Sequence, residues 1–172
     1  MNYRPATEHD IEAIAALHAD SWRRHYRGAF SDEYLDGDVL DDRRAVWTGR
    51  LTAPEDADHT VVAEAGGTIV GFAHTILDDD PMDGALVDNL HVAHDAKRGG
   101  VGSRLMAHAA SAVMTRGEIK GLYLLVLESN TAAQAFYAAR GGECTGREVS
   151  EAPGGGTVVG LRYVWRDPTT LL

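Results

Sequence analysis

The sequence has little of what disulfide-stabilised, membrane-spanning or nucleic-acid-binding proteins need. Its only cysteine is Cys144, so no disulfide can form within the chain. No apolar run approaches the length of about 20 residues that a membrane span requires, and residues 1–5 lack the apolar stretch of a secretory signal. Lys and Arg number 16 against 26 Asp and Glu, and the net charge of −10 speaks against a nucleic-acid partner. We therefore expect a cytoplasmic protein with no membrane and no nucleic-acid partner.

The composition that remains is that of a globular protein. Hydrophobic residues make up 44% of the 172 positions and charged residues 24%. This length suits one domain with one substantial core, so we expect residues 1–172 to form a single domain. The acidic residues gather in two patches, at 32–42 and 78–83.

The hydrophobic pattern alternates between helical and strand-like spacing along the chain. A helix expected at 8–19 continues or re-forms through Trp22 and Tyr26, and the strand at 122–127 is apolar enough to be buried on both faces. The expected strands are 2–6, 60–65, 68–76, 84–92, 122–127, 142–150 and 157–165. The expected helices are 8–19, 41–51, 102–116 (ending at Gly117) and 131–140. The order β-α-α-β-β-β-α-β-α-β-β, with a polar loop at 78–83, predicts an α+β fold with a mainly antiparallel sheet flanked by helices.

A glycine-rich loop joins the strand expected at 84–92 to the helix expected at 102–116. Glycine tolerates positive φ and lets the backbone approach a ligand, and free amides at a helix N-terminus bind anions. The glycines and cationic residues of the loop are Gly99, Gly100, Gly102, Lys97, Arg98 and Arg104. The loop therefore predicts a phosphate-bearing ligand, the alternative being a tight turn without a ligand.

The spacing of this loop argues against two common phosphate sites. The P-loop pattern G-x-x-x-x-G-K-S/T is absent, and Leu105 stands where a dinucleotide-binding loop has its third glycine. The segment K-R-G-G-V-G at 97–102 instead resembles the pyrophosphate loop of the GNAT superfamily of N-acetyltransferases. Lys97 departs from the Gln or Arg usual there, whereas Leu90-His91-Val92 is similar to the family's strand end.

A second motif strengthens the resemblance. Residues 130–141 match the family pattern N-x-x-A-x-x-F-Y-x-x-x-G, although Gly142 replaces the aromatic residue that usually follows. The matching residues are Asn130, Ala133, Phe136, Tyr137 and Gly141. With both motifs in the family's order, the resemblance covers residues 60–165.

The resemblance implies a GNAT-like fold in which two central strands part and acetyl-CoA lies in the gap as co-substrate, with no metal. The pantetheine arm would pair with the end of the strand at 84–92, and Tyr137 would lie near the sulfur. Asn130 would contact pantetheine, although it could also be a helix N-cap, or Thr131 with Gln134 a capping box. The residues implied for CoA are Leu90, Val92, Lys97, Arg98, Gly99, Gly100, Val101, Gly102, Ser103, Asn130 and Tyr137.

The reaction implied is direct transfer of an acetyl group to a primary amine in a ternary complex. An ammonium cannot attack, so a base must take its proton. Asp88 and His91 are alternative bases, and either could instead make a satisfied structural hydrogen bond. An amide near His91 would stabilise the oxyanion, and Tyr137 would donate to the leaving thiolate.

The acceptor is the least determined part of the prediction. In this family the N-terminal helices and the last hairpin wall the acceptor site, which implicates Trp22 and Tyr26. The acidic patch at 32–42 either attracts a cationic amine or is solvated surface. Small amines, antibiotics, polyamines, peptide N-termini and lysines are all open as acceptors, as is a homodimer.

Two rival functions use the same features: a non-catalytic acyl-CoA sensor on this scaffold, and a nucleotide-binding module. A metal site is not expected, because His91 and His94 lack the H-E-x-x-H spacing. Cys144 is expected to be a small buried hydrophobic residue.

Overall fold

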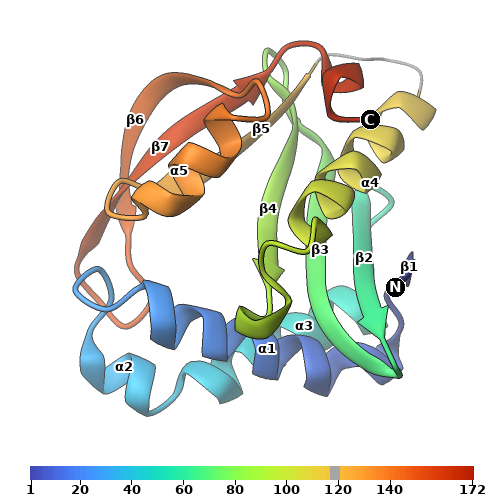
Figure 1. The fold of residues 1–172 in the computed structure, drawn as a ribbon. Coiled ribbons are helices and arrows are strands. Elements are labelled where there is room, and N and C mark those ends of the chain that lie inside the picture. Colours follow the sequence, from blue (N-terminus) through green and yellow to red (C-terminus); the bar gives the residue numbers. More distant parts are fainter. Residues whose placement is uncertain (117–120) are drawn as a thin grey trace.

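A computed structural model describes residues 1–116 and 121–172 of the chain. Seven strands form one sheet in the order β1-β2-β3-β4-β5-β7-β6, and every neighbouring pair is antiparallel except β4 and β5 (Figure 1). The strands are β1 (Asn2–Pro5), β2 (Asp58–Ala65), β3 (Thr68–Asp80), β4 (Gly84–Val92), β5 (Leu122–Leu127), β6 (Glu143–Glu151) and β7 (Thr157–Trp165). The helices are α1 (Ile11–His25), α2 (Asp32–Asp36), α3 (Val39–Thr52), α4 (Val101–Thr115) and α5 (Thr131–Ala138). Short 3-10 turns are η1 (Glu8–Asp10), η2 (His94–Ala96) and η3 (Pro168–Leu171).

Helices cover both faces of the sheet because successive side chains of a strand point to opposite faces. Val62 and Phe72 pack with Trp47 of α3 and with residues of α1. Their strand neighbours Val61 and Ala73 pack instead with α4. The α+β prediction is confirmed. None of the described helices has the length and apolar character needed to cross a bilayer.

Two element predictions need correction. Helix α2 was missed because its five residues are too few to show a period; Ser31 caps it by accepting the Tyr34 N–H. Residues 78–80 were expected in a loop but belong to β3, which pairs as far as Asp80 with Gly84. The helix end expected at Gly117 lies outside the described residues.

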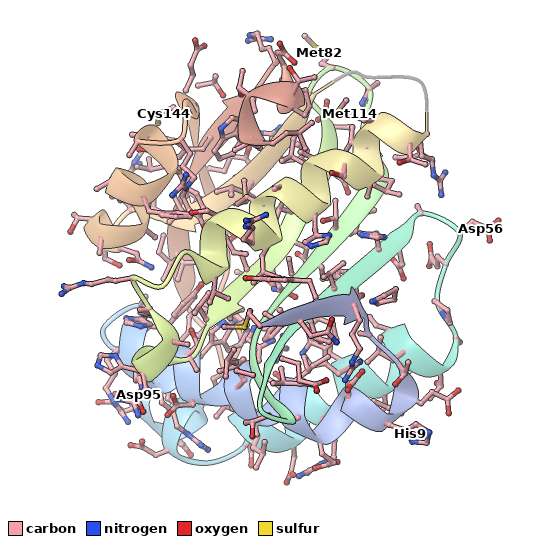
Figure 2. All side chains as sticks on the ribbon, turned by 45° about the vertical axis from the view of Figure 1, so that its right-hand side comes forward. His9, Asp56, Met82, Asp95, Met114 and Cys144 are labelled. Atoms are coloured by element: carbon pink, nitrogen blue, oxygen red, sulfur yellow. The ribbon has the colours of Figure 1, made fainter. Side chains whose placement is uncertain are left out.

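Two burial predictions need correction. The strand at 122–127 is buried on both faces only in part: Tyr123 is 4% exposed, but Leu125, two residues along on the same face, is 46% exposed. Cys144 is exposed on β6, the strand at the edge of the sheet (Figure 2).

β4 and β5 touch at one end and then separate, as Figure 1 shows. Only Ala85 with Leu122 and Leu86 with Tyr123 are paired between them. The contact is possible because β4 begins with Gly84 and β5 is preceded by Gly121: a Cβ on Gly84 would lie 2.4 Å from the carbonyl oxygen of Gly121. The edge of β4 that faces β5 therefore has no paired neighbour beyond Leu86 among the described strands.

Replacing Gly84 by alanine should disrupt this contact. Gly84 has φ +90, so alanine meets both backbone strain and the Gly121 carbonyl, and we expect a loss of about 2–4 kcal/mol in the free energy of unfolding. Gly66→Ala is the matched control: φ is +58 but nothing lies within 4 Å, so the loss should be only about 1 kcal/mol. Urea unfolding measures both, and equal losses would contradict the close approach.

Candidate active site

The loop before α4 presents unbonded amides. Among the described residues, the backbone N–H groups of residues 98–103 donate to no backbone or side-chain acceptor, whereas the Arg104 N–H already bonds to the Gly100 carbonyl at 3.1 Å. The first N–H groups of a helix have no partner within it, and their partial positive charge favours an anion. The loop can therefore bind an anion through several amides at once.

The backbone of this loop is left-handed at two positions. Arg98 has φ +65 and Gly100 has φ +79, and left-handed residues beside right-handed ones form anion-binding nests. Gly102 serves packing instead, because a Cβ there would lie 3.3 Å from Phe136 of α5. The loop thus sits where α4 meets α5.

Lys97 leaves the loop and contacts α1. Its Nζ lies 2.7 Å from His25 Nε2, and burial together with the charge of Arg24 lowers the pKa of Lys97. Arg98, the next residue of the loop, has an exposed side chain.

Asn130 is the N-cap of α5. Its side-chain oxygen accepts the Ala133 N–H at 3.2 Å, so the capping interpretation is confirmed. The Thr131–Gln134 capping box is wrong, because Gln134 donates to the carbonyls of Leu127 at 3.2 Å and Glu128 at 2.8 Å. The Asn130 amide nitrogen has no partner among the described residues and is available to a ligand.

Tyr137 stands on α5 with its ring against β7. It is 8% exposed and packs beside Tyr163 and Trp165, each with a centroid 6.0 Å away. Burial, reinforced by Tyr26, raises the pKa of Tyr137 above its usual value. Its hydroxyl stays protonated at neutral pH and forms no hydrogen bond within the described residues.

Asp88 and Asn89 lie where β4 bulges. Thr75 pairs with Val87 and His74 with Asn89, so Asp88 is the extra residue. Its carboxylate lies 2.6 Å from Arg50 Nη2, and its side chain is 31% exposed. Asp88 is therefore the more accessible of the two predicted bases.

His91 is enclosed by α1. Its Nδ1 lies 2.8 Å from Ser21 Oγ, and the ring of His18 is 4.4 Å away. Burial, with the charge of His25, lowers the pKa of His91 to about 3. The His91 ring is therefore buried and already bonded to Ser21, so it is less accessible to an incoming ammonium than Asp88 is.

The predicted acceptor-site aromatics are packed together. Trp22 is 7% exposed, with the Arg43 guanidinium 4.3 Å from its ring and Tyr26 stacked at 5.4 Å. Burial and the Asp88 carboxylate raise the pKa of Tyr26 to about 12. Of the two predicted residues, Tyr26 is half-buried and Trp22 is buried.

The β6–β7 hairpin packs against the N-terminal helices. Ala152 is buried in the aromatic cluster of α1 and α2, and a Cβ on Gly154 would lie 2.5 Å from Tyr34. In Figure 1 the hairpin tip reaches α2. The two halves of the sheet are thus joined below the gap between β4 and β5.

Arginines neutralise much of the acidic patch at 32–42. Arg27 pairs with Asp32 at 2.7 Å and also with Asp36, while Arg43 pairs with Asp42 at 3.0 Å. Exposed pairs of this kind favour the solvated-surface interpretation over an attractive entrance for cations.

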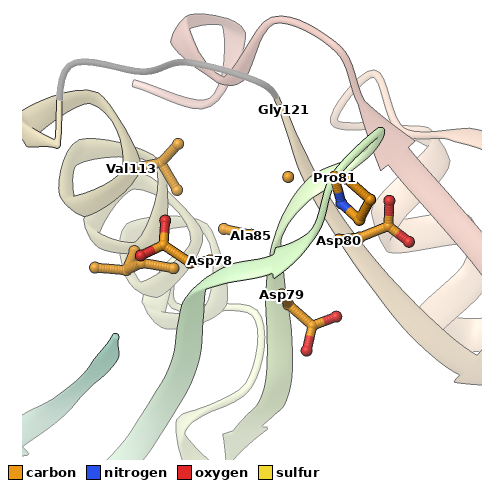
Figure 3. Close-up of a pocket in the computed structure, with 9 residues that line it drawn as sticks. Asp78, Asp79, Asp80, Pro81, Ala85, Val113 and Gly121 are labelled. Atoms are coloured by element: carbon orange, nitrogen blue, oxygen red, sulfur yellow. The ribbon is translucent and has the colours of Figure 1, made fainter. Parts of the chain in front are cut away.

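A cavity of about 260 Å³ lies away from the loop, at the end of the β3–β4 hairpin beside α4. Its acidic residues Asp78, Asp79 and Asp80 point in different directions (Figure 3). No group of three or more His, Cys, Asp or Glu in the described part of the chain could hold a metal ion.

Sequence reasoning missed Arg50 and Ser21, which contact Asp88 and His91. Both lie on helices distant in sequence from β4, by 38 and 70 residues. No local pattern marks such long-range partners; only the helix packing brings them there.

Three buried histidines should make the fold sensitive to acid. Burial lowers the pKa of His18, of His74 to about 4 and of His91 to about 3, whereas the unfolded chain titrates near 6.5. The unfolded state then binds more protons between these values, so stability rises with pH from about 4 to 6.5. For His74→Gln, the loss of unfolding free energy between pH 7 and 5 should shrink by about 2 kcal/mol. His9→Gln, at an exposed position, is the control and should lose as much unfolding free energy between pH 7 and 5 as the wild type does. Urea unfolding at the two pH values measures these losses, and equal losses in the wild type, His74→Gln and His9→Gln would contradict the expectation.

Comparison with known proteins agrees with this geometry. The Acetyltransferase (GNAT) family matches residues 14–141. The probable N-acetyltransferase Rv2775 of Mycobacterium tuberculosis is 26% identical over 161 residues, covering 89% of this chain and 86% of that protein. Ribosomal-protein-alanine N-acetyltransferase from Brucella melitensis superposes with a TM-score of 0.71 at 25% identity over 96% and 99% of the two chains. PaiA N-acetyltransferase from Thermoplasma acidophilum, solved with coenzyme A, gives 0.72 at 17% identity over 95% and 98%. The chain therefore belongs to the GNAT family of acetyltransferases.

Proposed function

We propose that this protein transfers the acetyl group of acetyl-CoA to a primary amine by direct attack within a ternary complex. The observation that carries the proposal is the row of unbonded amides at 98–103, placed beside the gap between β4 and β5. Solved GNAT-fold neighbours contain coenzyme A or acetyl-CoA, which supports the same donor here.

The residues fit a CoA diphosphate without any metal. Amides of Gly99, Gly100, Val101, Gly102 and Ser103 would bind its oxygens. Arg98 would add charge, and Lys97 would support the loop through His25. Each hydrogen bond to a charged oxygen contributes roughly 1.5–3 kcal/mol, so several together outweigh the repulsion of an acidic chain.

The pantetheine arm would lie along the open edge of β4 at Leu90 and Val92, with the Asn130 amide nitrogen within reach. Acetyl-CoA supplies an activated thioester carbonyl. A backbone N–H near His91 would stabilise negative charge on its oxygen.

We assign the base to Asp88 rather than His91. Asp88 is an accessible carboxylate at the bulge, whereas His91 is buried, bonded to Ser21 and neutral. Asp88 would take the ammonium proton directly or through water.

Tyr137 would stabilise the leaving thiolate. A free thiol such as that of cysteine has a pKa of about 8.5, below that of a tyrosine whose pKa burial has raised. Full proton transfer from Tyr137 is therefore unfavourable, and a hydrogen bond from its hydroxyl is the favoured role.

The acceptor would enter from the side of Tyr26 and the β6–β7 hairpin, with Trp22 as the packed support behind it. The Brucella neighbour is named for an alanine acceptor on a ribosomal protein. Several of the acidic residues at 32–42 of this chain are bound in salt bridges with arginines, so the patch favours no particular class of amine. Residues 1–172 would act as one acyltransferase domain, since all the strands join one sheet. Cytoplasmic location and a homodimer stay predictions.

Thiol release tests the activity. With acetyl-CoA and a panel of primary amines, the wild-type protein should release free CoA thiol at a rate that depends on the amine. Tyr137→Phe keeps the buried ring but loses the hydroxyl, and kcat should fall about 100-fold or more. Tyr163→Phe, on the neighbouring strand, is the matched control and should keep near-wild-type kcat. Tight CoA binding without turnover by any amine would instead support the sensor.

Calorimetry tests the donor site. Wild-type protein should bind CoA more tightly than NAD or ATP. Arg98→Gln should weaken CoA binding about 10-fold, the value of one charge-assisted hydrogen bond. Arg147→Gln removes an exposed arginine paired with Glu128 and should have no effect. Preference for NAD or ATP would overturn the acyltransferase proposal.

A further inference from the structure

One arginine of α3 holds two successive residues of β4. Arg50 Nη2 lies 2.6 Å from Asp88 Oδ2, and Arg50 Nη1 lies 2.7 Å from Asn89 Oδ1. Successive side chains of a regular strand point to opposite faces, so a single guanidinium could not reach both. The bulge at Asp88 turns both side chains to the α3 side of the sheet.

The three residues Arg50, Asp88 and Asn89, called the clamp below, make two further contacts: one between Asn89 and Asp88, and one between Arg50 and the core. The Asn89 side-chain nitrogen donates to the Asp88 carbonyl at 2.7 Å, so the two successive residues are also bonded to each other. The Arg50 guanidinium lies 5.2 Å from the ring of Trp47, which is fully buried. Planar arginine can bond two acceptors and stack on an aromatic ring at once, which lysine cannot do.

The position of the clamp links it to the gap between the strands. Pairing of β4 with β5 ends at Leu86, two residues before Asp88. A bulge bends its strand and increases the local twist. The clamp therefore lies between the last residue of β4 that pairs with β5 and the open edge at Leu90 and Val92.

We propose that Arg50 is a positioning residue that fixes the β4 bulge. It thereby sets the width of the gap between β4 and β5, in which acetyl-CoA would lie, and the direction of the Asp88 carboxylate. The inference rests on the proposed acetyltransferase function. Arg50 itself does not contact the reacting atoms; it acts through Asp88, through Asn89 and through the path of β4.

The test compares Arg50→Lys and Arg50→Met with Arg44→Lys and Arg44→Met. Arg44 lies on the same helix and pairs with Glu12 and Asp41 at the surface, away from β4, so it controls for loss of an α3 ion pair. For each variant we would measure CoA binding by calorimetry, kcat and KM with an amine that the wild type accepts, and the melting temperature.

Both Arg50 variants should lower kcat about 10- to 100-fold, the scale of a misplaced reacting group, and should weaken CoA binding. Lysine should rescue little, because it keeps the charge but not the two-pronged geometry. The Arg44 variants should match the wild type. Arg50 variants that melt earlier but keep wild-type kcat and CoA affinity would overturn the proposal, since the clamp would then be only structural.

Asn89→Ala keeps the test decisive if the Arg50 variants do not fold. This substitution removes the Arg50–Asn89 hydrogen bond and leaves the Arg50–Asp88 pair in place. It should lower kcat, as the Arg50 variants do, and an unchanged kcat would overturn the proposal. Failure of the proposed function and failure of the positioning role give different results. A wild type that releases no thiol with any amine defeats the proposed function, whereas an active wild type with fully active Arg50 and Asn89 variants defeats only the positioning role.

Discussion

β4 and β5 meet in backbone contact at Gly84 and Gly121, pair over two residues and then separate. This parting is the constraint from which the site follows. It leaves one edge of β4 without a partner, and it opens a gap bordered by α5 and by the N-terminal helices (Figure 1). The glycines allow the contact, the bulge at Asp88 follows two residues after the last pair, and the β6–β7 hairpin joins the separated halves through Ala152.

The electrostatics of the chain are organised locally. A protein of net charge −10 can bind an anion because its unbonded amides are concentrated in one loop, while many of its acidic residues are paired with arginines. The same logic holds around β4, where Arg50 compensates Asp88 and burial keeps His91 neutral. Charge at this site is thus set by pairing and burial rather than by composition.

Most of the helices and strands could be predicted from local sequence patterns. The glycine loop and the Asn130–Gly141 motif specified their own backbone, so β4, α4, β5 and α5 were predicted nearly to the residue. What failed depended on tertiary context. Leu125 is exposed although Tyr123 on the same face of β5 is buried, and Cys144 is exposed on the edge strand β6. Arg50 and Ser21 could not be found, because contacts across 38 and 70 residues leave no periodic signal.

A crystal structure of the protein with CoA tests the central claim most directly. The account predicts the diphosphate oxygens within hydrogen-bond distance of the amides of residues 98–103, and the pantetheine arm between β4 and β5 alongside Leu90 and Val92. CoA bound elsewhere, or these amides bonded within the protein while β4 and β5 close on each other, would contradict it.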